Sequence, residues 1–356
     1  MSDHQEFMQI AIDLAKKGIY SCKPNPRVGC VLVKNNKIIG QGFHYKAGED
    51  HAEIKAIKDA NSETKGATAY ISLEPCTHEG KTPPCVDAII AAQIGEVFFA
   101  MVDPNPKVSG QSIKILERAG VKVSCGLLEQ QARELNIGFG YRMSNNRPFI
   151  RTKIGASIDG RTALKNGNSQ WITSKESRQD VQQWRARSCG ILTSASTVLM
   201  DDPSLNVRLS DFSDEHQPIR FVLDSQLKTK GSEKIFKLSG ESFVYTLINN
   251  EPDETRENVL FVNRENGHVS LEDIIIDLAR KEFNEVLIEA GSNLNGAFLS
   301  RGLIDEIILY LAPSILGNSS RGMFELPAFN ELSESFNFYI ESIDQVGADL
   351  RIVLRK

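Results

Sequence analysis

The 356-residue sequence lacks an apolar run of the ~18–20 residues that a membrane-spanning helix needs. Its opening stretch, MSDHQEFMQIAIDLAKKG, has neither the basic segment nor the apolar segment of a secretory signal peptide. An excess of positive charge is also missing, because 46 acidic residues outnumber 41 lysines and arginines and give a net charge of −5. We therefore expect a cytoplasmic protein that binds neither membranes nor nucleic acid.

Cysteine is scarce as well, with six residues in the whole chain. They are Cys22, Cys30, Cys76, Cys85, Cys125 and Cys189. A reducing compartment disfavours structural disulfides, so we expect no disulfide between them. Internal repeats and low-complexity tracts are absent, and the length exceeds what one hydrophobic core usually supports. These features predict two unrelated globular domains.

The first part of the chain alternates between helix and strand patterns. The predicted helices cover 6–17, 51–60, 83–94, 112–120 and 129–143. The predicted strands cover 28–33, 37–44, 67–76, 96–103 and 121–126. The first two strands flank a polar turn and predict an antiparallel hairpin, whereas the alternation as a whole predicts an α/β unit with a mostly parallel sheet. The polar stretch SNNRP sets the predicted domains at 1–146 and 147–356.

The second part of the chain alternates again, so it is also predicted to be α/β. The predicted strands cover 149–160, 219–225, 242–248, 259–262, 305–313 and 349–356. A helix is predicted at 271–283, and 189–203 and 285–302 each predict a strand followed by a helix. In the last of these, the glycine-containing turn places backbone N–H groups at a helix N-terminus, where a cofactor phosphate can bind. A longer glycine fingerprint is absent.

A candidate metal site combines residues from three predicted elements. His51 opens one helix, Cys76 ends a strand, and Cys85 lies in the first turn of the next helix. One imidazole and two thiolates supply the three protein ligands of a catalytic zinc site, which keeps its fourth position for water. Helix N-termini favour thiolate over thiol, which suits Cys85.

Glu53, two residues after His51, is the candidate proton shuttle of this site. Zinc lowers the pKa of a bound water to roughly 7, and a carboxylate beside it can pass the proton to a leaving ammonia. His-x-Glu followed by Pro-Cys is the pattern of zinc deaminases. A His-x-Glu pair alone is uninformative, and two cysteines in one loop are also typical of structural zinc or of free thiols. The prediction therefore depends on the combination.

The His-x-Glu pair and the two cysteines, taken together, resemble the bifunctional deaminase/reductase family of riboflavin biosynthesis. The segment EPCTHEGKTPPC (74–85) separates its two cysteines by more than the Cys-x-x-Cys of most cytidine-deaminase-type enzymes, and this longer loop is characteristic of the family. The similarity continues through PNPRVGCVLV, DPNPKVSG, KIGASIDGRTAL, SQWITS, TVLMDDPSLNVR, VLDS and EAGSNLNGAFL. It covers essentially the whole chain.

The resemblance implies two folds and two reactions. The first domain would be a cytidine-deaminase-like αβα domain that deaminates a diamino-ribosylamino-pyrimidinone 5′-phosphate with zinc. The second would be a dihydrofolate-reductase-like α/β domain that reduces the ribosyl chain of the product to ribityl with NADPH. The implied partners are this small-molecule substrate and further copies of the chain in a homo-oligomer.

For the deaminase, the resemblance carries the metal ligands to His51, Cys76 and Cys85, and the proton shuttle to Glu53. It also implies four pocket residues, Asn25, His44, His78 and Lys81. Asn25 has the paired donor and acceptor needed to recognise an amide edge. His78 or Lys81 would meet the substrate phosphate. The alternative for each of the four is an ordinary turn or surface position.

For the reductase, the resemblance implies a larger set. The implied NADPH contacts are Gly155, Ala156, Trp171, Thr197, Asp201, Ser225, Gly291, Ser292, Asn293, Leu294, Asn295, Gly296 and Ala297. The implied substrate contacts are Lys153, Ser169, Arg185, Leu205, Arg208 and Glu289. Two arginines suit a ribose phosphate because guanidinium binds such anions bidentately. Lys153 and Asp201 are the candidate proton donors, while core packing for Trp171 and a helix end at Asp201 remain alternatives.

The sequence departs from the family pattern in two places, and it leaves two alternative functions. Cys189-Gly190 stands where many relatives have Asp-Ala, and Ser194 stands where many have glycine, which affects details of NADPH contact. A nucleic-acid base deaminase shares the zinc chemistry but needs a basic channel, which the acidic composition disfavours. A non-enzymatic zinc module would need a fourth protein ligand, for which His78 is the candidate.

Overall fold

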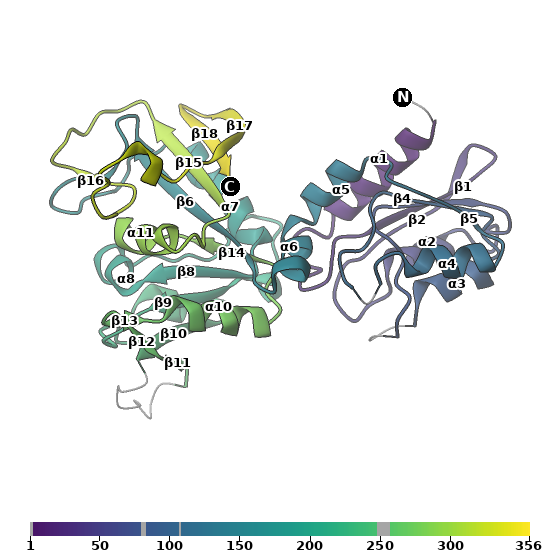
Figure 1. The fold of residues 1–356 in the computed structure, drawn as a ribbon, viewed down its shortest axis with the longest axis horizontal. Coiled ribbons are helices and arrows are strands. Elements are labelled where there is room, and N and C mark those ends of the chain that lie inside the picture. Colours follow the sequence, from purple (N-terminus) through teal and green to yellow (C-terminus); the bar gives the residue numbers. More distant parts are fainter. Residues whose placement is uncertain (1–2, 80–82, 107, 248–256) are drawn as a thin grey trace. The chain divides into compact units, whose positions relative to one another are not determined.

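The computed structural model describes residues 3–79, 83–106, 108–247 and 257–356. The chain forms two compact units, Met1–Arg147 and Pro148–Lys356. In each unit a central sheet is covered by helices (Figure 1). Because the carboxyl edge of a parallel sheet is where ligands bind in such folds, the strand order decides where each site lies.

The first unit has a five-stranded sheet in the order β2-β1-β3-β4-β5. Its strands are β1 (Gly29–Lys34), β2 (Lys37–Phe43), β3 (Thr68–Ile71), β4 (Glu96–Phe99) and β5 (Lys122–Cys125). β1 pairs antiparallel with both β2 and β3, so the predicted hairpin is confirmed. β3, β4 and β5 run parallel, as the alternation with helices requires.

Helices cover both faces of this sheet. They are α1 (Asp3–Lys16), α2 (Ala52–Asp59), α3 (Cys85–Ala91), α4 (Gln111–Arg118), α5 (Glu129–Leu135) and α6 (Ile137–Asn145). Successive side chains of a strand point to opposite faces. Cys30 and Leu32 of β1 therefore pack in the cluster with α2, α3 and α4, whereas Val31 and Val33 pack with α1 and α5. The two helix layers are separate in Figure 1.

The second unit has a nine-stranded sheet in the order β11-β10-β9-β8-β14-β6-β15-β18-β17. Its strands are β6 (Phe149–Ser157), β8 (Gly190–Ser194), β9 (Ile219–Leu223), β10 (Ser242–Leu247), β11 (Val259–Val262), β14 (Glu285–Ile288), β15 (Glu306–Ala312), β17 (Tyr339–Val346) and β18 (Asp349–Arg355). The strands from β11 to β15 pair in parallel, and β18 and β17 add an antiparallel edge. Two short ribbons pair β7 (Arg161–Ala163) with β16 (Arg321–Gly322) and β12 (Arg264–Glu265) with β13 (His268–Val269).

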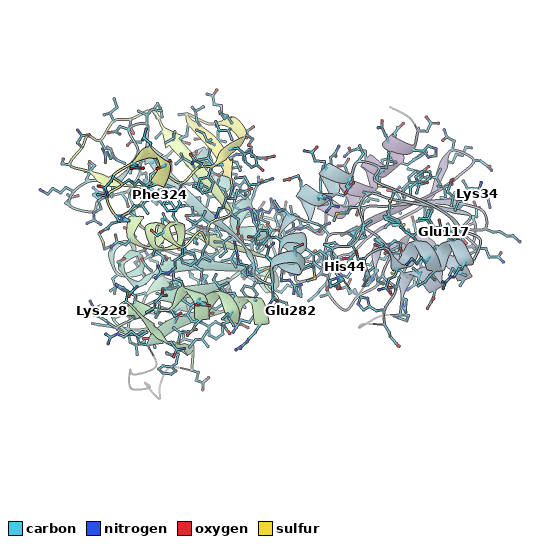
Figure 2. All side chains as sticks on the ribbon, in the orientation of Figure 1. Lys34, His44, Glu117, Lys228, Glu282 and Phe324 are labelled. Carbon is cyan, nitrogen blue, oxygen red and sulfur yellow. The ribbon has the colours of Figure 1, made fainter. Side chains whose placement is uncertain are left out.

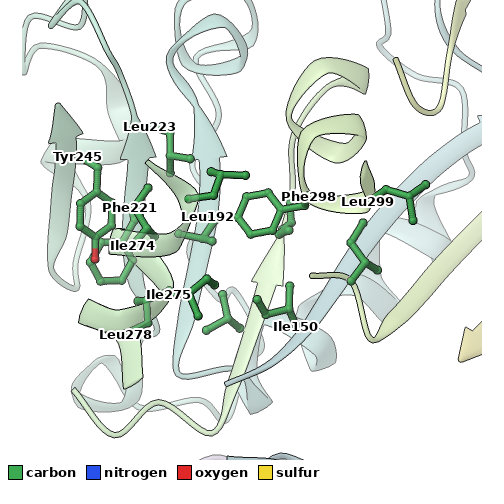
Figure 3. Close-up of a cluster of buried hydrophobic side chains, with 14 of the residues drawn as sticks. Ile150, Leu192, Phe221, Leu223, Tyr245, Ile274, Ile275, Leu278, Phe298 and Leu299 are labelled. Carbon is green, nitrogen blue, oxygen red and sulfur yellow. The ribbon is translucent and has the colours of Figure 1, made fainter. Parts of the chain in front are cut away.

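Helices also cover both faces of the second sheet. They are α7 (Lys175–Arg187), α8 (Ala195–Asp201), α9 (Lys234–Lys237), α10 (Leu271–Arg280) and α11 (Ser292–Ser300). Leu192, Phe221 and Phe298 belong to the cluster that includes α10 and α11 (Figure 3). The neighbours Ile191 and Val222 pack on the opposite face with α7, α8 and α9. Near-continuous apolar strands are thus explained by burial on both faces.

Four elements named here differ from the sequence prediction. The single helix predicted at 129–143 is wrong, because Asn136 interrupts it: the Asn136 carboxamide accepts from Arg27 N–H (2.8 Å) and donates to Arg27 C=O (2.9 Å). The strand predicted at 67–76 ends at Ile71, before the site begins. β17 carries no alternating pattern, since nearly all of its side chains are exposed, and it escaped prediction together with α7.

Candidate functional site

The carboxyl end of β3 in the first unit carries the candidate metal site. After β3 the chain reaches Cys76, while His51 lies immediately before α2 and Cys85 is the first residue of α3. Two helix N-termini therefore face the same point. Their unpaired N–H groups favour negative charge, and Cys85 N–H donates to Cys76 Sγ at 3.3 Å.

The three ligand atoms have the spacing of a tetrahedral metal site. His51 Nδ1 lies 3.2 Å from Cys85 Sγ and 3.6 Å from Cys76 Sγ, and all three atoms lie within 4.8 Å of one another. Tetrahedral zinc with bonds of roughly 2.0–2.3 Å separates nitrogen and sulfur ligands by about 3.6 Å. Among the described residues the group contains only these three ligands, which is the number of a catalytic site. The residues therefore fit zinc.

Burial and mutual contact prepare these groups for metal and proton chemistry. The thiol of Cys85 donates to Cys76, which lowers the pKa of Cys76 to about 4 and raises that of Cys85. The lowered pKa favours the thiolate form of Cys76, which is the form that binds metal. Glu53, which is only 4% exposed, lies in the first turn of α2 beside the Cys85 thiol. Burial, followed by repulsion from Cys76, raises the pKa of Glu53 to about 7.

Asn25 and His44 form a pair next to the metal ligands. His44, labelled in Figure 2, is buried, and its ring lies edge-on to the His51 ring at 5.1 Å. Burial, followed by repulsion from His51, lowers the pKa of His44 to about 4, so the ring is neutral near pH 7. A neutral ring that donates through Nδ1 to Asp50 C=O accepts through Nε2 from the Asn25 amide, which lies 3.0 Å away. This fixes the orientation of the Asn25 carboxamide.

Glu74 supports the site and was not singled out from the sequence. Its buried carboxylate accepts four hydrogen bonds, from Asp103 N–H, Gly110 N–H, and both the N–H and the hydroxyl of Ser112, at 2.8–3.1 Å. Glu74 therefore ties the segment after β4 to the loop between β3 and α3 that carries Cys76. The signal that could have identified Glu74 is its place in the sequence, as a carboxylate between a buried strand and the metal ligand Cys76.

The other two predicted pocket residues, His78 and Lys81, have no described contact with the metal ligands. His78 is exposed in the described structure, and Lys81 lies outside the described residues. None of the six cysteines, all of which lie in the described residues, forms a disulfide, which agrees with the expectation for Cys76 and Cys85.

In the second unit, a charged cluster lies at the centre of the parallel sheet. Glu289 directly follows β14 and is 5% exposed. Arg185 of α7 binds it through two hydrogen bonds of 2.5 and 2.9 Å, and Lys153 of β6 binds it at 3.0 Å. Burial alone would raise the pKa of Glu289, but the charges of Arg185 and Lys153 outweigh burial and lower it to about 2.

Arg208 extends this cluster with a second guanidinium. Arg185 and Arg208 both donate to the main-chain oxygen of Asn206, at 3.2 and 3.3 Å. Partial desolvation, followed by repulsion from Arg185, lowers the pKa of Arg208. The arrangement brings together Lys153, Arg185, Arg208 and Glu289, four of the predicted substrate residues. Its net positive charge suits a phosphate ester. Leu205, the fifth, lies buried in the same loop.

The predicted NADPH residues lie on several elements. Thr197 is in the first turn of α8, Ser225 follows β9, and Gly291 precedes α11. These positions follow three parallel strands at their carboxyl ends, where a dinucleotide binds in open α/β sheets. A Cβ added to Gly291 would meet nothing within 4 Å, so the N-terminus of α11 is accessible. Asp201 ends α8, as the alternative for this residue anticipated.

Other predicted NADPH residues also have local packing roles. A Cβ on Gly296 would lie 2.0 Å from Glu325 C=O, so glycine is required there by close packing. Asn295 is buried and accepts from the Thr152 hydroxyl at 2.9 Å. Core packing of Trp171 is ruled out, since its ring is 69% exposed and stacks on Arg178 at 4.4 Å.

Comparison with known proteins agrees with both sites. Residues 1–101 match the cytidine and deoxycytidylate deaminase zinc-binding region, and residues 148–352 match the RibD C-terminal domain. The chain is 44% identical to the riboflavin biosynthesis protein RibD of Escherichia coli K12, with 97% of each chain covered. It is 41% identical to RibD of Haemophilus influenzae, with 97% of this chain and 95% of that one covered.

This chain belongs to the RibD family.

Solved structures of relatives share the whole architecture. The structure of Acinetobacter baumannii RibD has a TM-score of 0.92 and 42% identity, and covers 99% of this chain and 98% of its own. A Thermotoga maritima structure, described as a diaminohydroxyphosphoribosylaminopyrimidine deaminase/5-amino-6-(5-phosphoribosylamino)uracil reductase, has a TM-score of 0.89, 32% identity and the same coverage. The predicted fold of both parts is confirmed.

As a RibD-family member, the chain is a bifunctional enzyme of riboflavin biosynthesis with deaminase and reductase activities. Its cofactors are Zn²⁺ and NADPH. No described helix is long and apolar enough to cross a membrane. The family and both activities were predicted from the sequence.

Proposed function

We propose that the first unit deaminates 2,5-diamino-6-ribosylamino-4(3H)-pyrimidinone 5′-phosphate and that the second reduces the product to 5-amino-6-ribitylamino-uracil 5′-phosphate. The two activities described for the Thermotoga maritima relative support both substrates. The observation that carries the proposal is the convergence of His51, Cys76 and Cys85 beside Glu53 in one unit, with a cationic cluster at the central strands β14 and β6 in the other.

In the deaminase, His51, Cys76 and Cys85 would hold zinc, which supplies a nucleophilic water near neutral pH. Glu53 takes the proton from the attacking water and delivers it to the leaving ammonia. Its burial and its position beside Cys85 support this role. Asn25 orients the pyrimidine. The NH2 group of the Asn25 side chain is bound to His44, so the side-chain oxygen of Asn25 accepts from a substrate N–H group.

In the reductase, the cationic cluster binds the substrate anion and the ribosyl group that is reduced. Arg185 and Arg208 hold the phosphate, and Glu289 fixes both Arg185 and Lys153. Lys153 retains further N–H donors and gives a proton to the ribose ring oxygen, which becomes a hydroxyl as the C1′–O bond breaks and a C1′=N bond forms. Bound NADPH would supply a hydride to C1′, which restores the C–N single bond, and the N-terminus of α11 would bind its pyrophosphate. Thr197, Ser225 and Trp171 line the cofactor side.

Two further properties are proposed from the sequence and the described surface. Homo-oligomer formation is supported by the edge strand β17, where Tyr339, Ile340 and Ile343 are each more than half exposed. Light scattering of the purified chain gives the mass directly, and a monomer at micromolar concentration would refute assembly. A cytoplasmic location is supported by six cysteines that form no disulfide, as is usual in a reducing compartment.

The substrate proposal is tested by following two products separately. Purified zinc-loaded chain is given the diamino-pyrimidinone phosphate, and ammonia is measured without NADPH. NADPH oxidation is then measured after the deaminated product is added. We expect ammonia release that needs no NADPH, followed by oxidation of one NADPH per molecule of product. Ammonia release from tRNA or single-stranded DNA but not from the pyrimidinone would instead favour the nucleic-acid deaminase alternative.

A further inference from the structure

The loop that follows α8 has a conformation that needs external support. It carries Leu205, whose φ of 48° lies in the left-handed region that non-glycine residues rarely adopt. Leu205 is buried, and the next residues, Asn206, Val207 and Arg208, lead to the guanidinium beside Arg185. Such backbone strain persists only where the surroundings fix the chain.

Two glutamine side chains provide that support. The Gln217 carboxamide accepts from Val207 N–H at 2.8 Å and donates to Val207 C=O at 2.9 Å, so it pairs with this residue as a neighbouring strand would. Gln182, which is buried on α7, accepts from Arg208 N–H at 3.1 Å. The main chain on both sides of the Val207–Arg208 peptide is therefore held by side chains.

The support has an electrostatic purpose. Arg185 and Arg208 donate to the same oxygen, that of Asn206, so two like charges are held close together. Glu289 neutralises Arg185 but shares its charge with Lys153. Without an anion the pair repels, and a free loop would relax and carry Arg208 away. A phosphate would then have to pull the loop back at a cost in affinity.

We propose that Gln182 and Gln217 are positioning residues of the reductase, which hold the loop so that Arg208 stands beside Arg185 before the substrate phosphate arrives. This inference rests on the proposed role of the two arginines in binding that phosphate. Neither glutamine touches the substrate in this arrangement. Both act through the main chain of Val207 and Arg208, and α7 supplies Gln182 together with Arg185.

The test compares two substrates, the phosphorylated ribosylaminouracil and the same compound after removal of its phosphate. Variants Gln217→Ala, Gln182→Ala and Arg208→Ala are assayed for NADPH oxidation as full-length, zinc-loaded chains. Losing one or two hydrogen bonds of about 1 kcal/mol each predicts a KM for the phosphorylated substrate raised about fivefold to thirtyfold. The kcat, the KM for NADPH and the ammonia release should not change. With the dephosphorylated substrate, the glutamine variants should equal the wild type.

The outcomes distinguish the phosphate-binding role of the arginines from the positioning role of the glutamines. If Arg208→Ala loses as much with the dephosphorylated substrate, the phosphate role of the arginines is wrong. If Arg208→Ala depends on the phosphate but the glutamine variants do not, the positioning role is wrong. Gln183→Ala, an exposed neighbour on α7, is the matched control and should behave as the wild type. Unchanged ammonia release and KM for NADPH show that a weakened variant is folded.

Discussion

Replacing Glu53 by glutamine separates its chemical role from its structural role. The amide has nearly the shape of the carboxyl group but cannot carry a proton between water and ammonia. We expect ammonia release to fall by roughly 10²–10⁴-fold, the usual contribution of a general acid–base group. Zinc should stay bound, because its ligands are His51, Cys76 and Cys85. NADPH oxidation of the deaminated substrate should continue at the wild-type rate.

The same variant should stabilise the metal-free first unit. Burial, followed by repulsion from Cys76, raises the pKa of Glu53 from 4.5 to about 7. The folded state therefore holds its proton more tightly than the unfolded state, and stability falls as the pH rises from 4.5 to 7. Above pH 7 the ionised carboxylate costs about 3 kcal/mol, at about 1.4 kcal/mol per pKa unit. Glutamine does not ionise and avoids this cost.

Thermal unfolding in the presence of a chelator measures this difference. At pH 8 the variant should melt several degrees above the wild type, and near pH 4.5 the two should coincide. Equal melting temperatures at pH 8 would show that the carboxyl of Glu53 is not desolvated as the structure indicates. Ammonia release that survives the substitution would refute its role as proton shuttle. Loss of both enzymatic activities together would contradict two independent sites.

Three further substitutions test the remaining framework. Cys85→Ala should reduce bound zinc, measured by mass spectrometry of the metal, to a small fraction of one per chain and abolish ammonia release but not NADPH oxidation. Glu289→Gln should destabilise the second unit by about 3–5 kcal/mol at pH 7, because Arg185 and Lys153 lose their buried counter-charge. The difference in unfolding free energy between wild type and variant should shrink below pH 4.5, as the wild-type carboxylate, whose pKa is lowered to about 2, approaches protonation. A difference that stays constant with pH in denaturant titrations would contradict the ion-pair explanation. Glu74→Ala should lower the melting temperature of the first unit strongly, since four donors lose their buried acceptor. Glu117→Ala should not, because the Glu117 side chain of α4 is exposed.

Most of the fold could be predicted because helix and strand periodicity reports local burial. The hairpin of β1 and β2 and the strand–helix unit of β14 and α11 needed no more than this. Elements whose side chains do not alternate were harder: β17 is exposed on nearly every residue, so the pattern that marks a half-buried strand is missing. The break at Asn136 depends on a hydrogen-bond partner, Arg27, that lies 109 positions away and leaves no local signal.

The candidate site divides in the same way. The types and spacing of His51, Glu53, Cys76 and Cys85 are written in the sequence, and so is the longer loop that distinguishes the riboflavin deaminases. Residues that act by supporting others were not visible there. Glu74 and Gln217 belong to common residue types, and their importance comes from the main-chain groups that they bind.

The sequence by itself determined the chemistry of this protein: a three-ligand zinc site with a proton shuttle, and a reductase of the same family. The tertiary structure decided which distant charges meet. Arg185 and Glu289 are 104 positions apart and are joined only because α7 packs beside β14. Strand order and crossover helices set such contacts, and they depend on the packing of the whole unit, which no local pattern of residues records.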